Sequence, residues 1–247
     1  MMIDEYLARI GYDGPRDATA ATLCALHERH LLSVPFENLD IHLGRPILPD
    51  EQRIVDKVVA QRRGGFCYEL NGAFAALLRA LGFDVTMLSA RVPRADGTTS
   101  PEFDHMTLLV RIDGERWLAD VGFGECFLHP LRLDDRGEQH DPAGTFRIEQ
   151  LDERDWLLSS SSKPEYLFSL EPHTLADYAA MCRYHQTSPR SSFTQKRLCS
   201  LATATGRITL RDDRLIVTEG GAKTEEPIEN DAAWRDALRV RFGVELP

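Results

Sequence analysis

The sequence predicts an α+β protein, because its hydrophobic periodicity changes character once along the chain. Apolar residues recur at helical spacing through residues 3–82, and strand-like alternation prevails after Gly82. A helical block followed by runs of strands is typical of the α+β class. With 247 residues, 43% hydrophobic and 28% charged, the chain is long enough to bury a substantial core.

Four amphipathic helices are expected in the first block. Their apolar stripes are Ile3, Tyr6, Leu7 and Ile10; Leu23, Leu26, His27, His30, Leu31 and Val34; Ile54, Val55, Val58 and Val59; and Leu70, Ala73, Phe74, Leu77, Leu78 and Leu81. Pro35 ends the second helix and Gly82 ends the fourth. Gly64 and Gly65 stand ahead of the fourth helix, whose first turn contains Cys67.

Strands and turns dominate the rest of the chain. Residues 84–92 are expected to form a strand, and residues 105–123 a hairpin around Asp113-Gly114, a dipeptide that favours a two-residue I′ turn. The other expected elements are strand pairs within 145–160 and 206–221, a helix at Leu175–His185 with Thr174 as N-cap, and a helix from Asn230 to Phe242.

This order divides the chain into three expected domains. Residues 1–83 form a helical domain that carries Cys67 at a helix N-terminus. Residues 84–187 form a β-rich domain, and residues 188–247 form a C-terminal α/β region.

The register of the predicted hairpin brings an imidazole beside a carboxylate. Pairing outward from the turn places Thr107 opposite Asp120, and His105 shares their face because strand side chains alternate. Such diagonal neighbours, roughly 7–8 Å apart, can meet through long side chains. The opposite face is apolar, with Met106, Leu108, Val110, Ile112, Trp117, Ala119 and Val121. Taken alone, an ordinary surface His–Asp pair is the more common interpretation.

Cys67 has two interpretations from its position. A thiol at a helix N-terminus meets the positive end of the helix dipole, and an imidazole–carboxylate pair beside it would make a nucleophile. Alternatively, Cys67 is a small buried apolar residue, because Leu70 and Phe74 continue from it along one helix face. Spacing alone leaves these two interpretations about equal.

The remaining cysteines do not suggest a disulfide framework or a metal site. Cys24 and Cys182 fall in expected helices, Cys199 falls in an expected strand, and Cys126 follows a glycine-bearing loop. The cysteine count is odd and no C-x-x-C occurs, which is typical of a reducing compartment. Cys24, His27 and His30 share part of one helix, but no second cluster completes a tetrahedral site, so no metal is expected.

Charge excludes some classes of partner. The formal net charge of −10, without a basic stripe, argues against nucleic-acid binding. No apolar run approaches the length of a membrane span, and the first residues lack the pattern of a secretion signal. A cytoplasmic protein that acts on small molecules is therefore expected, with any anionic ligand held by local groups.

Four segments in order resemble the arylamine N-acetyltransferases. They are SVPFENLDIH at 33–42, RGGFCYELNG at 63–72, DHMTLLV at 104–110 and WLADVGFGE at 117–125, and SPRSSFTQK at 188–196 is a further similar segment. The resemblance implies a helical domain, a central antiparallel β-barrel-like domain and a C-terminal α/β region around a Cys-His-Asp core. Asp104 departs from the family pattern, in which a small hydroxylated residue often precedes the histidine.

The resemblance also implies a reaction and its residues. Cys67, His105 and Asp120 would form the triad, and Cys67 would carry an acetyl group from acetyl-CoA to an arylamine, arylhydrazine or N-hydroxyarylamine. No permanently bound cofactor is implied. The implied roles of other residues are acceptor binding by Phe36, Val92, Phe123 and Phe193, coenzyme approach at Gly122 and Gly124, and support by Glu37, Arg63 and Glu69.

Three other functions fit parts of the same pattern. Relatives with this triad include amide synthases that close a macrolactam from a carrier-bound acyl chain. A Cys-His-Asp hydrolase or a transglutaminase-like enzyme shares the residue order. A non-catalytic binding module would be expected to lack a triad member, and none is missing here.

Overall fold

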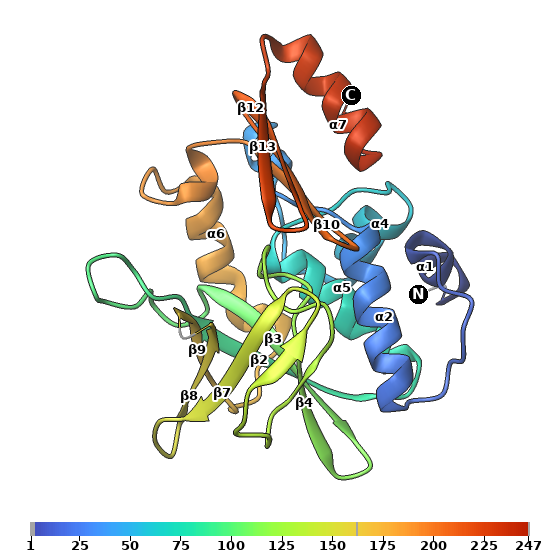
Figure 1. Cartoon of the computed structure of the whole chain (residues 1–247), viewed down its shortest axis with the longest axis vertical. Helices are drawn as coiled ribbons and strands as arrows, with labels where there is room; N and C mark the ends of the chain where they lie inside the picture. Colours follow the sequence, from blue (N-terminus) through green and yellow to red (C-terminus); the bar gives the residue numbers. More distant parts are fainter. Residues whose placement is uncertain (1–2, 162, 247) are drawn as a thin grey trace.

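The computed structural model of the chain describes residues 3–161 and 163–246, and it confirms the α+β class. Helices fill the first third, a large antiparallel sheet follows, and a second sheet with one helix completes the chain (Figure 1). Over the described ranges, no helix is both long and apolar enough to cross a bilayer.

The helical block contains the four expected helices and one short addition. The helices are α1 (Ile3–Ile10), α2 (Ala20–Ser33), α3 (Leu39–His42), α4 (Glu51–Val59) and α5 (Cys67–Ala80). Side-chain caps begin two of them: Thr19 accepts a hydrogen bond from the Thr22 amide, and Asp50 accepts one from Arg53. The side chains of α5 from Cys67 to Leu78 are buried, so this helix forms the centre of the block.

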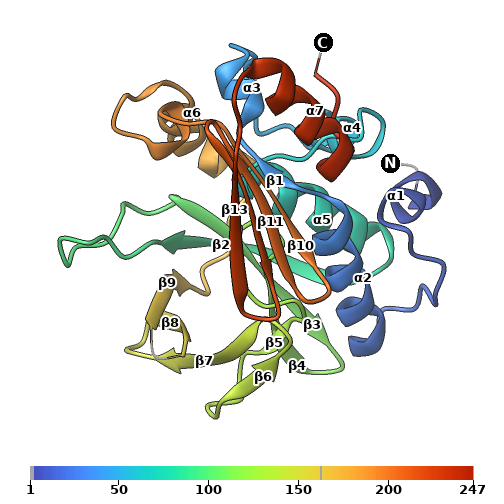
Figure 2. The same ribbon diagram turned by 45° about the horizontal axis from the view of Figure 1, so that its top comes forward.

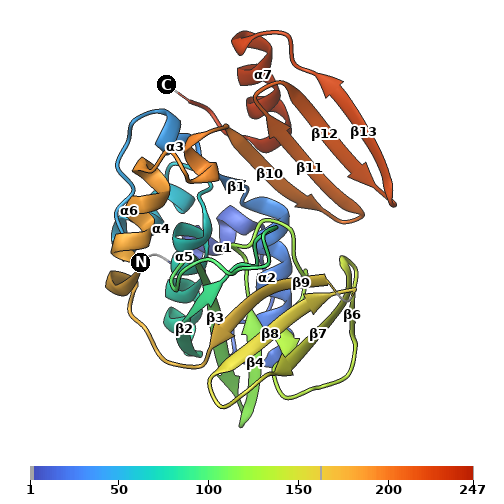
Figure 3. The ribbon, with the colours of Figure 1, turned by 90° about the vertical axis from the view of Figure 1, so that its left-hand side faces the viewer.

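An eight-stranded antiparallel sheet packs against α5 through β2 and β3. Its order is β5-β4-β3-β2-β9-β8-β7-β6. The strands are β2 (Asp84–Arg91), β3 (His105–Ile112), β4 (Glu115–Ala119), β5 (Leu131–Arg132), β6 (Gln139–Asp141), β7 (Gly144–Gln150), β8 (Asp155–Ser160) and β9 (Lys163–Ser169). The sheet curls on itself, which gives the expected barrel-like shape (Figure 3).

The predicted hairpin has the predicted register. Leu108 pairs with Ala119, and Ile112 pairs with Glu115 across the turn. Asp113 and Gly114 have φ angles of 51° and 84°, as a I′ turn requires. Because the register holds, the apolar face of the hairpin joins the same hydrophobic cluster as α5, while the opposite face lines the interior of the curled sheet.

A smaller sheet and the last helix form the end of the molecule opposite to β7 and β8 (Figures 1 and 3). The connecting helices are η1 (Leu175–Tyr178), α6 (Ala179–Thr187) and η2 (Ser192–Thr194). The sheet has the order β1-β10-β11-β12-β13, with β1 (Phe36–Glu37), β10 (Leu198–Thr203), β11 (Gly206–Arg211), β12 (Arg214–Glu219) and β13 (Ala222–Pro227), and α7 (Asp231–Phe242) covers one side. Strand β1 comes from the helical block, so the two ends of the chain share this sheet (Figure 2).

Several strands have no signal of alternation in the sequence. Every residue of β13 is exposed, because it is an outer strand with polar side chains on both faces. Strand β9 contains Pro164, a residue that normally argues against a strand interior. Strands β1 and β5 have two residues each, too short for any periodicity to appear.

Candidate active site

Two glycines place the N-terminus of α5 against the preceding chain. A Cβ atom at Gly64 would lie 1.8 Å from the Pro35 carbonyl oxygen, and one at Gly65 would lie 2.6 Å from the Glu69 carboxylate. Any larger residue would force these segments apart. The Glu69 carboxylate accepts a hydrogen bond of 3.1 Å from the Phe66 amide, so it satisfies one of the unpaired donors at the start of the helix. Cys67 follows as the first residue of α5.

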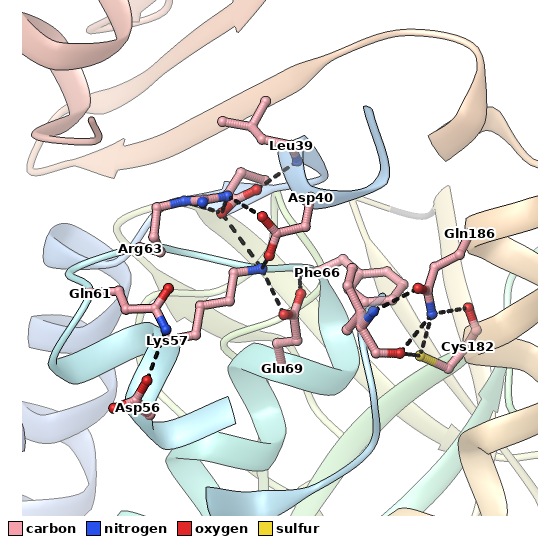
Figure 4. Close-up of polar contacts among 12 residues, drawn as sticks. Leu39, Asp40, Asp56, Lys57, Gln61, Arg63, Phe66, Glu69, Cys182 and Gln186 are labelled. Carbon is pink, nitrogen blue, oxygen red and sulfur yellow. Dashed lines mark hydrogen bonds and ion pairs between the residues drawn. The ribbon is translucent and has the colours of Figure 1, made fainter. Parts of the chain in front are cut away.

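A buried ion network fixes this helix start (Figure 4). Lys57 Nζ lies 2.7 Å from both Asp40 and Glu69, and Arg63 Nη2 lies 2.8 Å from Glu37. Burial raises the pKa of Glu69 to about 7, against the lowering effect of Lys57. The expected support by Glu37, Arg63 and Glu69 thus has a geometric basis, in which Lys57 and Asp40 complete the network.

The hairpin brings His105 and Asp120 into contact. His105 Nε2 donates to Asp120 Oδ2 over 2.6 Å, and their side chains are 4% and 0% exposed. Burial raises the pKa of Asp120, but His105 and the hydrogen bonds to the carboxylate outweigh burial and lower the pKa below its usual value. Asp120 is therefore a carboxylate held ready to bind an imidazolium.

Asn71 links this pair to the helix that carries Cys67. It lies one turn after Cys67 in α5, and its Nδ2 donates to Asp120 Oδ1 over 2.9 Å and to the Met106 carbonyl over 2.6 Å. Its Oδ1 accepts from the Val121 amide over 2.9 Å. Sequence reasoning missed Asn71, although its spacing of four residues from Cys67 places both on one helix face.

Gly122 brings the loop after β4 onto the helix start. A Cβ atom there would lie 2.8 Å from Cys67 Cα and 2.7 Å from Asn71 Nδ2, so only glycine fits. Its amide donates to Asp120 Oδ1 over 2.9 Å, so this N–H group already has a hydrogen-bond partner within the protein. Gly122 therefore has a structural reason to be glycine, and its approach to a coenzyme stays a prediction. Gly124 has a φ of 92°, a conformation that favours glycine.

The expected role of Cys67 as a nucleophile depends on the imidazole–carboxylate pair, because the helix end does not by itself lower the pKa of the thiol. Burial raises the pKa of Cys67 well above its usual value, the carboxylates Asp120 and Asp104 add to the rise, and a backbone hydrogen bond from Met106 opposes it only partly. Cys67 is 4% exposed. A base must therefore take the proton, and the backbone of Cys67 adjoins the residues that hold the His105–Asp120 pair.

The expected acceptor-binding residues divide into three places. Phe36 and Phe193 form one aromatic pair, with ring centroids 6.1 Å apart. Phe123 packs edge-to-face on His105, with centroids 5.0 Å apart. Val92 lies just after β2, where its amide donates to Ser100 Oγ, and its part in a pocket stays a prediction.

A second His–Asp pair lies beside the first. His185 Nε2 is 3.2 Å from Asp104 Oδ1, and the His185 ring packs edge-to-face on Phe193 with centroids 5.2 Å apart. Burial raises the pKa of Asp104, but His185 and Ser100 outweigh it and lower the pKa overall. The sequence singled out Asp104 as a departure from the family pattern, whereas the involvement of His185 had no signal.

The expected absence of a metal concerned Cys24, His27 and His30. His27 and His30 instead form hydrogen bonds within the protein, to Leu128 and Asp120 and to Tyr6 respectively. Within residues 3–161 and 163–246, no group of three His, Cys, Asp or Glu side chains could hold a metal ion.

A cavity of about 350 Å³ opens where the two sheets meet, and Glu125 and Cys126 form part of one wall. Gly206, Arg207 and neighbouring residues of β10 and β11 form the opposite wall. Arg207 is a partly buried cation, and burial lowers its pKa. The cavity is large enough for part of a small-molecule substrate.

The α+β fold and the grouping of a cysteine, a histidine and a carboxylate on adjoining backbone are typical of enzymes that transfer acyl groups through a thioester. A family model described as N-acetyltransferase matches residues 19–247. The chain belongs to the arylamine N-acetyltransferase family.

Individual relatives are similar to this chain over nearly its whole length. Arylamine N-acetyltransferase of Escherichia coli (strain K12) is 36% identical over 250 residues, which cover 98% of this chain and 89% of the relative. The solved arylamine N-acetyltransferase of Mycobacterium smegmatis is 34% identical with a TM-score of 0.93, over 100% of this chain and 93% of that one. The Mycobacterium marinum enzyme, solved in complex with CoA, is 30% identical with a TM-score of 0.90, over 98% and 92% of the two chains.

Proposed function

We propose that this enzyme transfers an acetyl group from acetyl-CoA through a Cys67 thioester to an arylamine, an arylhydrazine or an N-hydroxyarylamine. The observation that carries the assignment of residues is the buried 2.6 Å contact between His105 and Asp120, tied to the Cys67 helix by Asn71. The related enzymes named above, one of them bound to CoA, supply the substrate classes.

The hydrogen bonds define how His105 would act. Because Asp120 accepts from Nε2, neutral His105 carries its proton on Nε2 and presents the lone pair of Nδ1. Nδ1 is then the atom that takes the Cys67 proton. Asp120 stabilises the resulting imidazolium, which offsets the unfavourable burial of the thiolate. The thiol is thus deprotonated as it reacts.

The reaction has two acyl transfers. In the first, the Cys67 sulfur attacks the thioester carbonyl of acetyl-CoA, the bond to the coenzyme sulfur breaks, and His105 returns a proton to the departing thiol. In the second, the amine nitrogen attacks the Cys67 thioester, His105 accepts the amine proton, and the Cys67 sulfur leaves. Exchange between two thioesters is close to thermoneutral, so the acetyl group stays reactive enough for a weakly basic arylamine.

The cavity at Glu125 and Cys126 is the proposed place for part of the coenzyme. It begins directly after Gly122 and Gly124, the positions at which coenzyme approach is expected. Arg207 supplies a positive charge there, which would hold an anionic substrate against the negative charge of the whole protein. On the acceptor side, Phe36, Phe193 and Phe123 would contact the aryl ring, and Val92 would complete the apolar wall.

The cellular location proposed for the enzyme is the cytoplasm. Cys24, Cys67, Cys126, Cys182 and Cys199 are free, as is usual where thiols are kept reduced. The proposed partners are small molecules, and neither nucleic acid nor a membrane is required.

Intact-mass spectrometry tests the proposal. Wild-type enzyme mixed with acetyl-CoA should gain one acetyl group and lose it when an arylhydrazine is added. Cys67→Ala should gain none and retain the wild-type circular dichroism spectrum. Cys24→Ala is the matched control, because it removes a partly buried free thiol of α2 that does not line the proposed coenzyme cavity, and it should acetylate normally.

Acetylation of Cys67→Ala at the wild-type rate would overturn the assignment. Loss of the acetyl group to water at the same rate with and without amine would instead favour a hydrolase. Failure to accept acetyl-CoA, combined with acylation by a carrier-bound chain, would favour an amide synthase.

A further inference from the structure

The loop that carries Gly122, Phe123 and Gly124 is held at both of its ends by one side chain. His27, in the middle of α2, accepts a hydrogen bond from the Asp120 amide at Nε2 over 3.0 Å. Its Nδ1 lies 2.7 Å from the Leu128 carbonyl oxygen. Asp120 and Leu128 bracket residues 121–127, so a single imidazole spans the loop from first residue to last.

The two partners fix the protonation state of His27. An amide N–H can only donate, so Nε2 must present a lone pair to Asp120. A carbonyl oxygen can only accept, so Nδ1 must carry the proton. His27 is therefore neutral, with its proton on Nδ1. Burial supports this state, because it lowers the pKa of His27 to about 4.

Asp120 needs such a contact because it lies beyond the regular hairpin. The pairing of β3 and β4 ends at Leu108 with Ala119, one residue before Asp120. Its carboxylate is fixed by His105, Asn71 and the Gly122 amide, whereas its own backbone amide is fixed by His27. The position of the carboxylate depends on both sets of contacts.

The His27 ring is itself fixed by packing. It is 0% exposed, stacks on Phe127 with ring centroids 5.6 Å apart, and meets Phe74 of α5 edge-to-face at 5.8 Å. Phe127 belongs to the far end of the same loop. The ring thus has one orientation, in which both nitrogens meet their partners.

We infer that His27 is a positioning residue for acetyl transfer, which holds Asp120 and the loop 121–127 in the geometry that His105 and Cys67 need. The inference rests on the proposed function of the triad. It adds a residue from α2. The His27 nitrogens contact neither His105 nor Cys67, but they hold the backbone of Asp120 and Leu128 in place.

Two substitutions separate the two hydrogen bonds. In His27→Gln, the side-chain oxygen reaches the position of Nε2 and can still accept from Asp120. In His27→Asn, the side-chain nitrogen occupies the position of Nδ1 and can donate only to Leu128. Both remove the aromatic ring, so both lose comparable packing against Phe74 and Phe127.

The expected result is a difference in rate between variants of similar stability. His27→Gln should acetylate Cys67 within about threefold of wild type, whereas His27→Asn should be about 10- to 100-fold slower. Alkylation of Cys67 by iodoacetamide, followed from pH 6 to 9 as the probe range, should show the same order and a displaced pH profile only for His27→Asn. His30→Gln is the control, since His30 is equally buried in α2 and also touches Phe74 but not the loop.

Equal rates for the two His27 variants, or rates that follow their melting temperatures together with His30→Gln, would overturn the inference. Alkylation needs no coenzyme, so it separates this inference from the choice of acetyl-CoA as donor. If His27→Asn does not fold, nitrogen NMR of histidine-labelled wild type decides. A neutral His27 with its proton on Nδ1 supports the inference, and a proton on Nε2 overturns it.

Discussion

The molecule contains two His–Asp pairs near Cys67, and they differ in how their carboxylates are held. His105–Asp120 is joined at 2.6 Å, and its side chains are 4% and 0% exposed. His185–Asp104 is joined at 3.2 Å, and its side chains are 8% and 17% exposed. The same two residue types therefore occur side by side in a tight and a looser form.

The difference lies in the neighbours of each carboxylate. Asp120 accepts from His105, Asn71 and the Gly122 amide, so both of its oxygens have fixed directions. The Asp104 carboxylate has His185 and Ser100 as its polar neighbours and partial access to water. A fixed carboxylate can orient a reacting imidazole, whereas a looser one acts mainly through its charge.

The largest expected effect comes from Asp120→Asn. An amide cannot stabilise the His105 imidazolium as a carboxylate does, and it favours the wrong tautomer, so single-turnover acetylation of Cys67 should fall by about 10³- to 10⁴-fold. Rapid-quench intact-mass spectrometry measures this rate. Asp104→Asn is the matched control, and a comparable loss there would abolish the distinction between the pairs.

An intermediate effect is expected from acid, which should lower the free energy of unfolding through His27, the residue that holds the Asp120 backbone in the tighter pair. Burial lowers the pKa of His27 to about 4, while unfolded histidine titrates near 6.5. Between these values the unfolded chain binds the additional proton, so stability is lost as pH falls from about 6.5 to 4. His27 accounts for a loss of about 3 kcal/mol in the free energy of unfolding over this range. His30, whose pKa burial also lowers, adds to the loss.

Urea unfolding at a series of pH values measures this loss. His27→Gln should flatten the dependence between pH 6.5 and 4, because glutamine does not titrate. An unchanged slope in that variant would show that His27 is already protonated in the folded enzyme.

The smallest expected effect comes from the charge of Asp104. It tests whether that charge slows or speeds the reaction of the Cys67 thiol. The Asp104 charge contributes to raising the pKa of the Cys67 thiol. Asp104→Asn should therefore speed iodoacetamide alkylation of Cys67 near neutral pH, by about two- to fivefold. His185→Gln leaves the charge of Asp104 uncompensated and should not speed it. Slower alkylation in Asp104→Asn would indicate that the looser pair also positions His105.

Local sequence predicted the parts of the site that depend on spacing. The Asp113-Gly114 turn fixed the hairpin register, and the register placed His105 beside Asp120. The stripe from Leu70 to Leu81 identified α5, and the structure places Gly64, just before that helix, against the Pro35 carbonyl. These inferences hold because turn geometry and periodicity act over a few residues.

Contacts between distant segments had no such signal. His27 was assigned to the apolar stripe of α2, yet its nitrogens bond to residues more than 90 positions away. Asn71 and His185 were not singled out, because an isolated polar residue in a helix does not indicate its partner. The raised pKa of the Cys67 thiol likewise had no local signal: a helix end is visible in the sequence, whereas burial depends on everything packed around the thiol.

By itself the chain specified where Cys67, His105 and Asp120 stand along local elements, since short-range geometry needs no knowledge of the remaining fold. Only folding in three dimensions decided how strongly each is held, because desolvation and hydrogen-bond partners are contributed by segments that meet across the core. The contrast between Asp120 and Asp104 was therefore decided by the tertiary structure.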